Sequence, residues 1–170
     1  FFLIVSLFFN YRYYKTIQEQ KYQYTTFLNH FYFEVTDTLN SLNIILEKDL
    51  SGESLEKEFA KLAYYLDKVD NSLTESTSYI SGIDTHGITL LRQAFQTIKY
   101  GIEYNEHRIP SFHEDGKVSE NERKYLLGLK DQMQNVKESL YSEETRQENP
   151  NLPKWEFNNI VRDIGTGSDD

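Results

Sequence analysis

The side chains that could carry out chemistry are few in this sequence, and the histidines come first. No two of them stand three or four residues apart, the spacing that places two metal-binding rings on one face of a helix. The nearest approach to a ligand set is one polar segment with His107, His113, Glu114 and Asp115. A solvated loop explains this segment without a metal. We therefore predict no metal ion and no cofactor.

Nucleophilic catalysis also lacks its usual signals. The chain has no cysteine, no Gly-x-Ser-x-Gly turn and no glycine-rich phosphate loop. Its adjacent carboxylates, such as Glu143 and Glu144, lie in polar segments where burial would not tune their pKa. The run from Asp84 to Gly87 is explained by the start of a helix. The sequence predicts a protein that is not an enzyme.

Two sets of aromatic and apolar residues leave alternatives open. The first set is a possible small-ligand pocket between helices or, alternatively, a group of boundary residues with rings inward and hydroxyls outward; it comprises Tyr64, Tyr100, Tyr104 and Tyr125. The second is a possible partner-docking face of a short C-terminal helix or, alternatively, packing within the chain; it comprises Trp155, Phe157, Ile160 and Ile164.

Apolar residues at alternating three- and four-residue steps predict the elements that would position these groups. The expected helices cover residues 16–49, 54–80, 85–106 and 119–141, and Ser119 with Glu122 forms a capping box at the start of the last. Four such helices predict an all-α, up-down-up-down four-helix bundle. Residues 142–164 are expected to form a polar linker and a short fifth helix, and residues 165–170 a disordered tail. No segment alternates as a strand would.

The first fifteen residues have a different character. Nine residues, apolar except for Ser6, are followed by Asn10 and then by tyrosines and cations, the flank typical of a membrane interface. We predict that residues 1–15 are the end of a truncated transmembrane anchor; the alternatives are a signal-peptide remnant and a buried segment. The protein would then be a single-pass plasma-membrane protein. Its body would be extracytoplasmic, although Arg12 and Lys15 favour the inner side. No break precedes the next helix, which predicts one continuous rod.

Charge narrows the possible partners. The formal net charge is −9, which argues against nonspecific nucleic-acid binding, since that needs a basic surface. The predicted function is a non-catalytic, membrane-anchored helical module of the bacterial envelope that binds a protein partner or associates with itself. The alternative is a ligand-sensing extracytoplasmic four-helix-bundle domain of a truncated receptor, in which a small ligand binds the body.

Overall fold

The structure is a computed structural model that describes residues 2–84, 88–104, 107–109, 111–112 and 116–163. These residues are mostly helical, which confirms the all-α prediction. The helices are α1 (Phe2–Glu47), α2 (Glu53–Tyr79), α3 (Ile88–Tyr100), α4 (Glu120–Leu140) and α5 (Lys154–Asp163). Two short antiparallel hairpins accompany them, β1 (Ile102–Tyr104) with β2 (His107–Ile109) and β3 (Tyr141–Ser142) with β4 (Gln147–Glu148).

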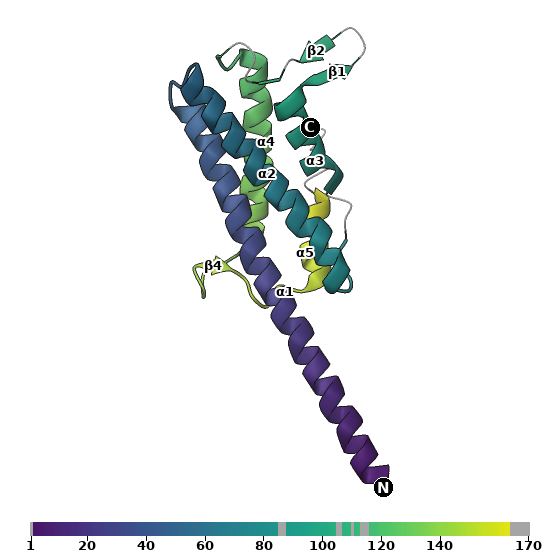
Figure 1. Cartoon of the computed structure of the whole chain (residues 1–170). Coiled ribbons are helices and arrows are strands. Elements are labelled where there is room, and N and C mark those ends of the chain that lie inside the picture. The colour runs from purple at the N-terminus through teal and green to yellow at the C-terminus, as the bar shows by residue number, and fades with distance from the viewer. Residues whose placement is uncertain (1, 85–87, 105–106, 110, 113–115, 164–170) are drawn as a thin grey trace.

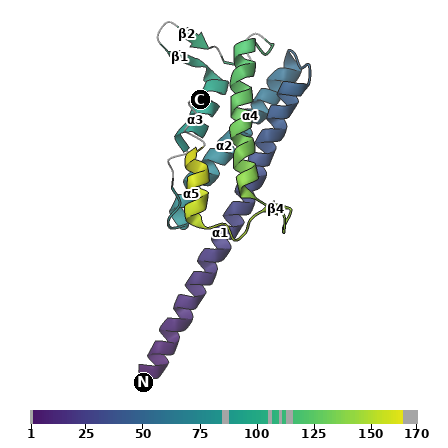
Figure 2. The same ribbon diagram turned by 180° about the vertical axis from the view of Figure 1, so that it is seen from behind.

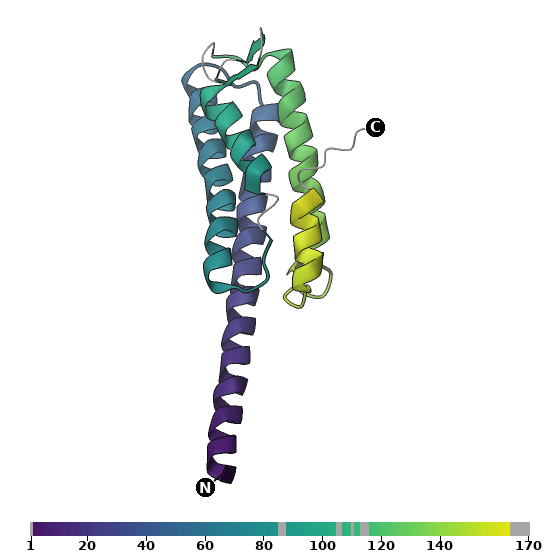
Figure 3. The same cartoon turned by 90° about the vertical axis from the view of Figure 1, so that its right-hand side faces the viewer.

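The helices form a body from which α1 projects as a long rod (Figure 1). Within the body α1 packs against α2 and α4, while α2 also contacts α3 and α4 contacts α5. The rear and side views show α5 near the end of the body from which α1 emerges, and α3 nearer the opposite end (Figures 2 and 3). Helix α3 is shorter than the helix predicted over residues 85–106, and α5 lies within the segment where a short fifth helix was predicted.

The buried face of each long helix is the one that the spacing predicted. Burial of these apolar side chains is the main force that holds helices of this kind together. On α1 the buried residues at three- and four-residue steps are Tyr24, Leu28, Phe31, Val35, Leu39, Leu42 and Leu46. On α2 they are Leu55, Phe59, Leu62, Leu66, Val69 and Leu73, and on α4 they are Leu126, Leu129, Met133, Val136 and Leu140.

The start of α4 and the end of α1 are held by specific polar contacts. The predicted capping box is present: the Ser119 amide donates to Glu122 Oε2 at 2.7 Å, and the Glu122 amide donates to Ser119 Oγ at 3.3 Å. Nearby, the Arg123 guanidinium donates to the carbonyl oxygen of Leu46 at 2.9 Å. A cation at that position satisfies one of the carbonyls that a helix leaves free at its C-terminus.

The third predicted helix ends earlier than expected, and the residues after it form a short hairpin. Helix α3 stops at Tyr100 because Gly101 adopts a φ of 75°, a left-handed conformation that ends a helix and that glycine enters without steric cost. The chain then forms the β1–β2 hairpin, in which Ile102 pairs with Ile109. Strands of two or three residues are too short to show an alternating pattern. Most of the run from Asp84 to Gly87, where a helix start was predicted, lies outside the described residues.

Helix α1 is continuous from Phe2 to Glu47, yet the predicted membrane placement was wrong. Across the described part of the chain, no helix carries an apolar stretch long enough to cross a membrane. Such a stretch needs roughly 20 residues, whereas α1 turns polar at Asn10 and becomes charged at Arg12, Lys15 and Glu19. The prediction of a single-pass plasma-membrane protein with an extracytoplasmic body is therefore contradicted.

Helix α5 is fastened to the body by an aromatic cluster and by polar contacts. The Phe157 side chain is fully buried, and its ring centroid lies 5.2 Å from that of Phe27 and 5.4 Å from that of Phe31. Both pairs have edge-to-face geometry, the favourable arrangement for aromatic rings. The Asn158 amide group also donates to the Gly82 carbonyl oxygen and accepts from the Asp84 amide, at 2.8 and 2.9 Å.

Polar pairs also join α2 to its neighbours. On α3, Arg92 donates through Nε and a terminal nitrogen to Asp70 Oδ2 of α2, at 3.2 and 3.0 Å. On α1, Glu34 accepts from the Ser72 hydroxyl of α2 at 2.5 Å. Burial raises the pKa of the Glu34 carboxyl, and the Ser72 hydrogen bond opposes part of that rise. Glu34 is thus a partly buried acid at the α1–α2 contact.

Replacing Phe31 with alanine tests the aromatic cluster. The ring is fully buried between α1 and α5, so Phe31→Ala should lower the free energy of unfolding by about 3–5 kcal/mol. Chemical denaturation measures this quantity. The control is Phe33→Ala on the same helix, whose ring is 45% exposed and whose loss should cost less than about 1 kcal/mol. An equal decrease in the free energy of unfolding in the two variants would contradict the assignment of Phe31 to the core.

The raised pKa of Glu34 predicts a dependence of stability on pH. An acid whose pKa is higher in the folded than in the unfolded chain opposes folding increasingly as pH rises from the unfolded value through the folded value. Glu34→Gln cannot titrate, so its stability relative to the native chain should increase between about pH 4 and about pH 7. Urea denaturation at both pH values measures the change. The control Glu19→Gln, at an exposed site on α1, should show no such increase.

Candidate interaction surface

The most unusual surface of the protein is the projecting part of α1. All residues from 3 to 23 are exposed, and burial against the body begins at Tyr24. We call residues 3–23 the α1 extension. Its large exposed apolar side chains are Leu3, Ile4, Val5, Leu7, Phe8, Phe9, Tyr11, Tyr13, Tyr14, Ile17 and Tyr22. Contiguous apolar surface of this extent on a folded protein typically marks an interaction site.

Among the described residues, local contacts accompany the helical hydrogen bonds of the α1 extension. The Thr16 hydroxyl donates to the Arg12 carbonyl at 3.0 Å, and the Lys15 ammonium lies 3.8 Å from the Glu19 carboxylate. The Arg12 guanidinium lies 5.8 Å from the centre of the Phe8 ring. Neither glycine nor proline interrupts the segment. The extension therefore continues the helix that the body anchors, and its apolar side chains face outward around much of its circumference.

The predicted docking face of α5 is divided in the structure. Trp155 is 66% exposed, Phe157 is fully buried and Ile160 is half-buried, while Ile164 lies outside the described residues. Phe157 therefore packs within the chain. The ammonium of Lys154, at the start of α5, sits 5.6 Å from the centre of the Tyr24 ring, where α1 leaves the body.

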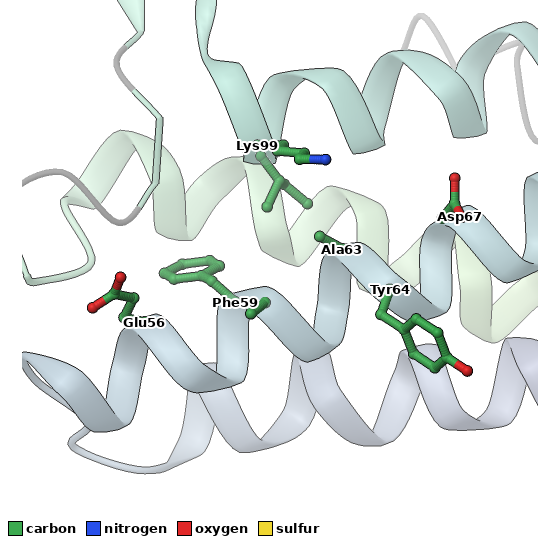
Figure 4. Close-up of a pocket in the computed structure, with 8 residues that line it drawn as sticks. Glu56, Phe59, Ala63, Tyr64, Asp67 and Lys99 are labelled. Carbon is green, nitrogen blue, oxygen red and sulfur yellow. The ribbon is translucent and has the colours of Figure 1, made fainter.

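A second surface feature is an open cavity of about 460 Å³ between α2 and α3. Phe59 and Ile98 are among its lining residues and are almost fully buried, and Ala60 and Ala63 leave the space above them free. Figure 4 shows Lys99 reaching over the cavity from α3, and Tyr64 on the side of α2 away from α3. The cavity is an apolar hollow with charged side chains at its rim.

The four predicted pocket tyrosines occupy different surroundings. Among the described side chains, Tyr64 is the member of the set that lines the cavity. Tyr100 is 63% exposed, with the Lys99 ammonium 5.1 Å from its ring centre. Tyr125 is half-buried on α4 against Phe112, at a ring separation of 5.5 Å, and burial raises the pKa of its hydroxyl. Only the backbone of Tyr104, in β1, lies within the described structure.

Within the described residues, no group of three or more histidine or carboxylate side chains is arranged to hold a metal ion. Of the possible ligands that the sequence analysis named, His107 begins strand β2. The other three, His113, Glu114 and Asp115, lie outside the described residues.

The comparisons with known proteins supply no further assignment. No protein-family model matches the chain, and neither the curated proteins nor the solved structures contain a significant match. The site must therefore be argued from its own residues. Its main feature is the α1 extension, whose first part, up to Lys15, the sequence analysis had attributed to a membrane anchor.

Removing the α1 extension tests whether it contributes to folding. A chain that begins at Gln23 keeps every buried residue of α1, so its thermal unfolding midpoint should stay within about 2 °C of the native value. A matched variant that begins at Leu28 removes Tyr24 and Phe27 from the aromatic cluster and should unfold at a clearly lower temperature. A large decrease in the unfolding midpoint of the variant that begins at Gln23 would show that the residues before it stabilise the body.

Proposed function

We propose that this protein is a non-catalytic helical module for protein–protein interaction or assembly, which presents the α1 extension to a protein partner. The observation that carries the proposal is that residues 3–23 are all exposed and yet rich in leucine, isoleucine, phenylalanine and tyrosine. Aromatic side chains of this kind are enriched at protein interfaces, and burial of their apolar area would drive association.

The body supports this role by holding the extension. In the proposed arrangement, α1, α2 and α4 form three columns of a four-helix bundle, and α3 and α5 together supply the fourth. The α1 residues from Tyr24 to Leu46 are fixed by that packing, so the helix leaves the body in a defined direction. A partner then meets a preformed helix and does not bear the cost of ordering it, which is a general advantage in binding.

The chemistry of the extension favours a protein as the partner. A helix with apolar side chains at three- and four-residue steps can dock into a groove or against another helix. Its charged side chains are few, namely Arg12, Lys15, Glu19 and Lys21. Together with the net charge of −9, this gives no basic surface for nucleic acid.

Small-ligand binding in the α2–α3 cavity is the weaker candidate. Its volume of about 460 Å³ is within the range of ligand sites. However, Glu56, Asp67 and Lys99 are exposed at its rim, and Figure 4 shows Tyr64 directed away from α3. The polar groups do not converge on the apolar floor, as they do in typical ligand sites.

Photo-crosslinking in the cells that make the protein tests the proposal. A benzophenone-bearing phenylalanine in place of Tyr14, whose side chain is 62% exposed on the extension, should give discrete protein adducts on irradiation. The same residue in place of Tyr100, which is 63% exposed on α3, is the matched control and should give few. Mass spectrometry identifies the adducts. Absence of protein adducts at Tyr14, or equal labelling from both positions, would reject the proposal.

A further inference from the structure

We infer that α5 is a detachable cover that controls how much of α1 a partner can reach. When α5 leaves α1 while the rest of the body stays folded, the aromatic rings beneath it become exposed and lengthen the apolar surface of the α1 extension. This inference rests on the proposed function, because it concerns the regulation of the same interaction surface. It follows from how α5 is held, from what it covers, and from one polar group that it buries.

The apolar hold on α5 comes from few side chains. Among the described residues of this helix, Phe157 and Val161 are fully buried, and Leu152 is buried just before the helix begins. A helix of 10 residues is too short to be stable by itself, so these contacts must offset the loss of conformational freedom in the segment. By contrast, α2 is lined with buried apolar residues from Leu55 to Leu73. Helix α5 should therefore open at a lower free energy than the body.

The polar contacts that the structure describes between α5 and the body converge on one connection, residues 81–84 after α2. They are Lys154 Nζ to the Ser81 carbonyl, the Asn158 amide group to the Gly82 carbonyl and the Asp84 amide, and Arg162 to the Asp84 carboxylate, at 2.8 to 3.2 Å. These residues lie at exposed or half-buried positions, so water can replace each contact once α5 has left. Losing this set therefore leaves none of these groups buried and unpaired.

Helix α5 covers the part of α1 that directly follows the extension, as the side view shows (Figure 3). The Phe157 ring contacts those of Tyr24, Phe27 and Phe31, with centroid separations of 6.5, 5.2 and 5.4 Å. Tyr24 is the residue after Gln23, where the α1 extension ends. The three rings occupy about two further turns of the same helix, which also packs on α2 and α4 through contacts that do not involve α5. Detachment thus adds aromatic surface in line with the extension.

One buried polar group opposes the closed arrangement. Within the described residues, the Tyr24 hydroxyl is buried and has no hydrogen-bond partner. A polar group buried in this way costs free energy, because it has lost its hydrogen bonds to water. Two residues of α5 cover this side chain: the Lys154 ammonium lies 5.6 Å from the ring centre, and the Phe157 ring packs against it. Detachment of α5 lets water reach the hydroxyl and recovers part of this cost.

Binding of a partner along the extension and detachment of α5 are therefore coupled. A partner that packs on residues 3–23 gains the rings of Tyr24, Phe27 and Phe31 only in the open form. A ligand that binds one of two forms more tightly shifts the population toward that form. By the same linkage, any change that opens α5 strengthens partner binding. In the closed arrangement α5 thus limits the surface that the partner can bury.

Thiol labelling tests whether α5 opens by itself. Val161→Cys on α5 and Val69→Cys on α2 place the same small change at fully buried sites, in a chain without cysteine. Without denaturant, the Val161→Cys chain should react with a thiol reagent at least about tenfold faster, and low urea should hardly accelerate the reaction, because little surface is exposed in a local opening. A rate equal to or below that of Val69→Cys would show that α5 opens only when the body unfolds, and would overturn the inference.

Photo-crosslinking of α5 variants tests the regulation. With the benzophenone-bearing residue in place of Tyr14, Phe157→Ala removes the ring that holds α5 and should raise the yield of protein adducts per chain at least about threefold. Trp155→Ala, on the same helix but 66% exposed, is the matched control and should leave the yield unchanged. Asn158→Ala removes polar contacts without removing a core side chain, should also raise the yield, and decides the test if circular dichroism shows that Phe157→Ala unfolds the body. No increase in the folded variants would reject the inference.

The two proposals fail in different ways. If Tyr14 forms adducts but their yield does not rise when α5 is weakened, the protein still binds a partner and only the regulation is rejected. If none of the chains forms protein adducts at Tyr14, the proposed function fails and the regulation falls with it, even where the Val161→Cys chain reacts faster than the Val69→Cys chain.

Discussion

The body depends on the burial of one face of α1 between Tyr24 and Leu46. Residues on this face contact α2, α4 or α5, so three separate parts of the chain are held by the same stripe of side chains. At one end of the stripe the ring of Phe157 packs edge-on against three aromatic rings of α1. At the other end Arg123 closes the last turn of α1. Without this face the shorter helices would have little to pack on.

Much of this core was predictable from the sequence because it follows from local rules. The three- and four-residue spacing identified the buried faces of α1, α2 and α4, and the pair Ser119 and Glu122 identified the start of α4. Each of these signals acts within a single helix. They required no knowledge of which segments would meet in space.

The remaining features depend on contacts that spacing does not encode. The end of α3 is set by the backbone conformation of Gly101, whereas the apolar spacing through Ile102 suggested a longer helix. The burial of Phe157, and not Trp155, depends on where α5 lands on the body. The sequence could not show which of the four tyrosines, Tyr64, Tyr100, Tyr104 and Tyr125, line a pocket. Each side chain is amphipathic and suits a pocket or a boundary position equally. The apolar start of the chain resembled a membrane anchor in its flanks, although the stretch was short.

The continuity of α1 also has a mechanical consequence. A helix without a glycine, a proline or a loop between the extension and the body has no hinge at Tyr24. Any rotation or pull applied at residues 3–23 is therefore delivered along a stiff rod to the aromatic junction of Tyr24, Phe27 and Phe157. A force on the extension would therefore act first on the packing of α5 against α1, because Phe157 of α5 contacts Tyr24 and Phe27 at this junction.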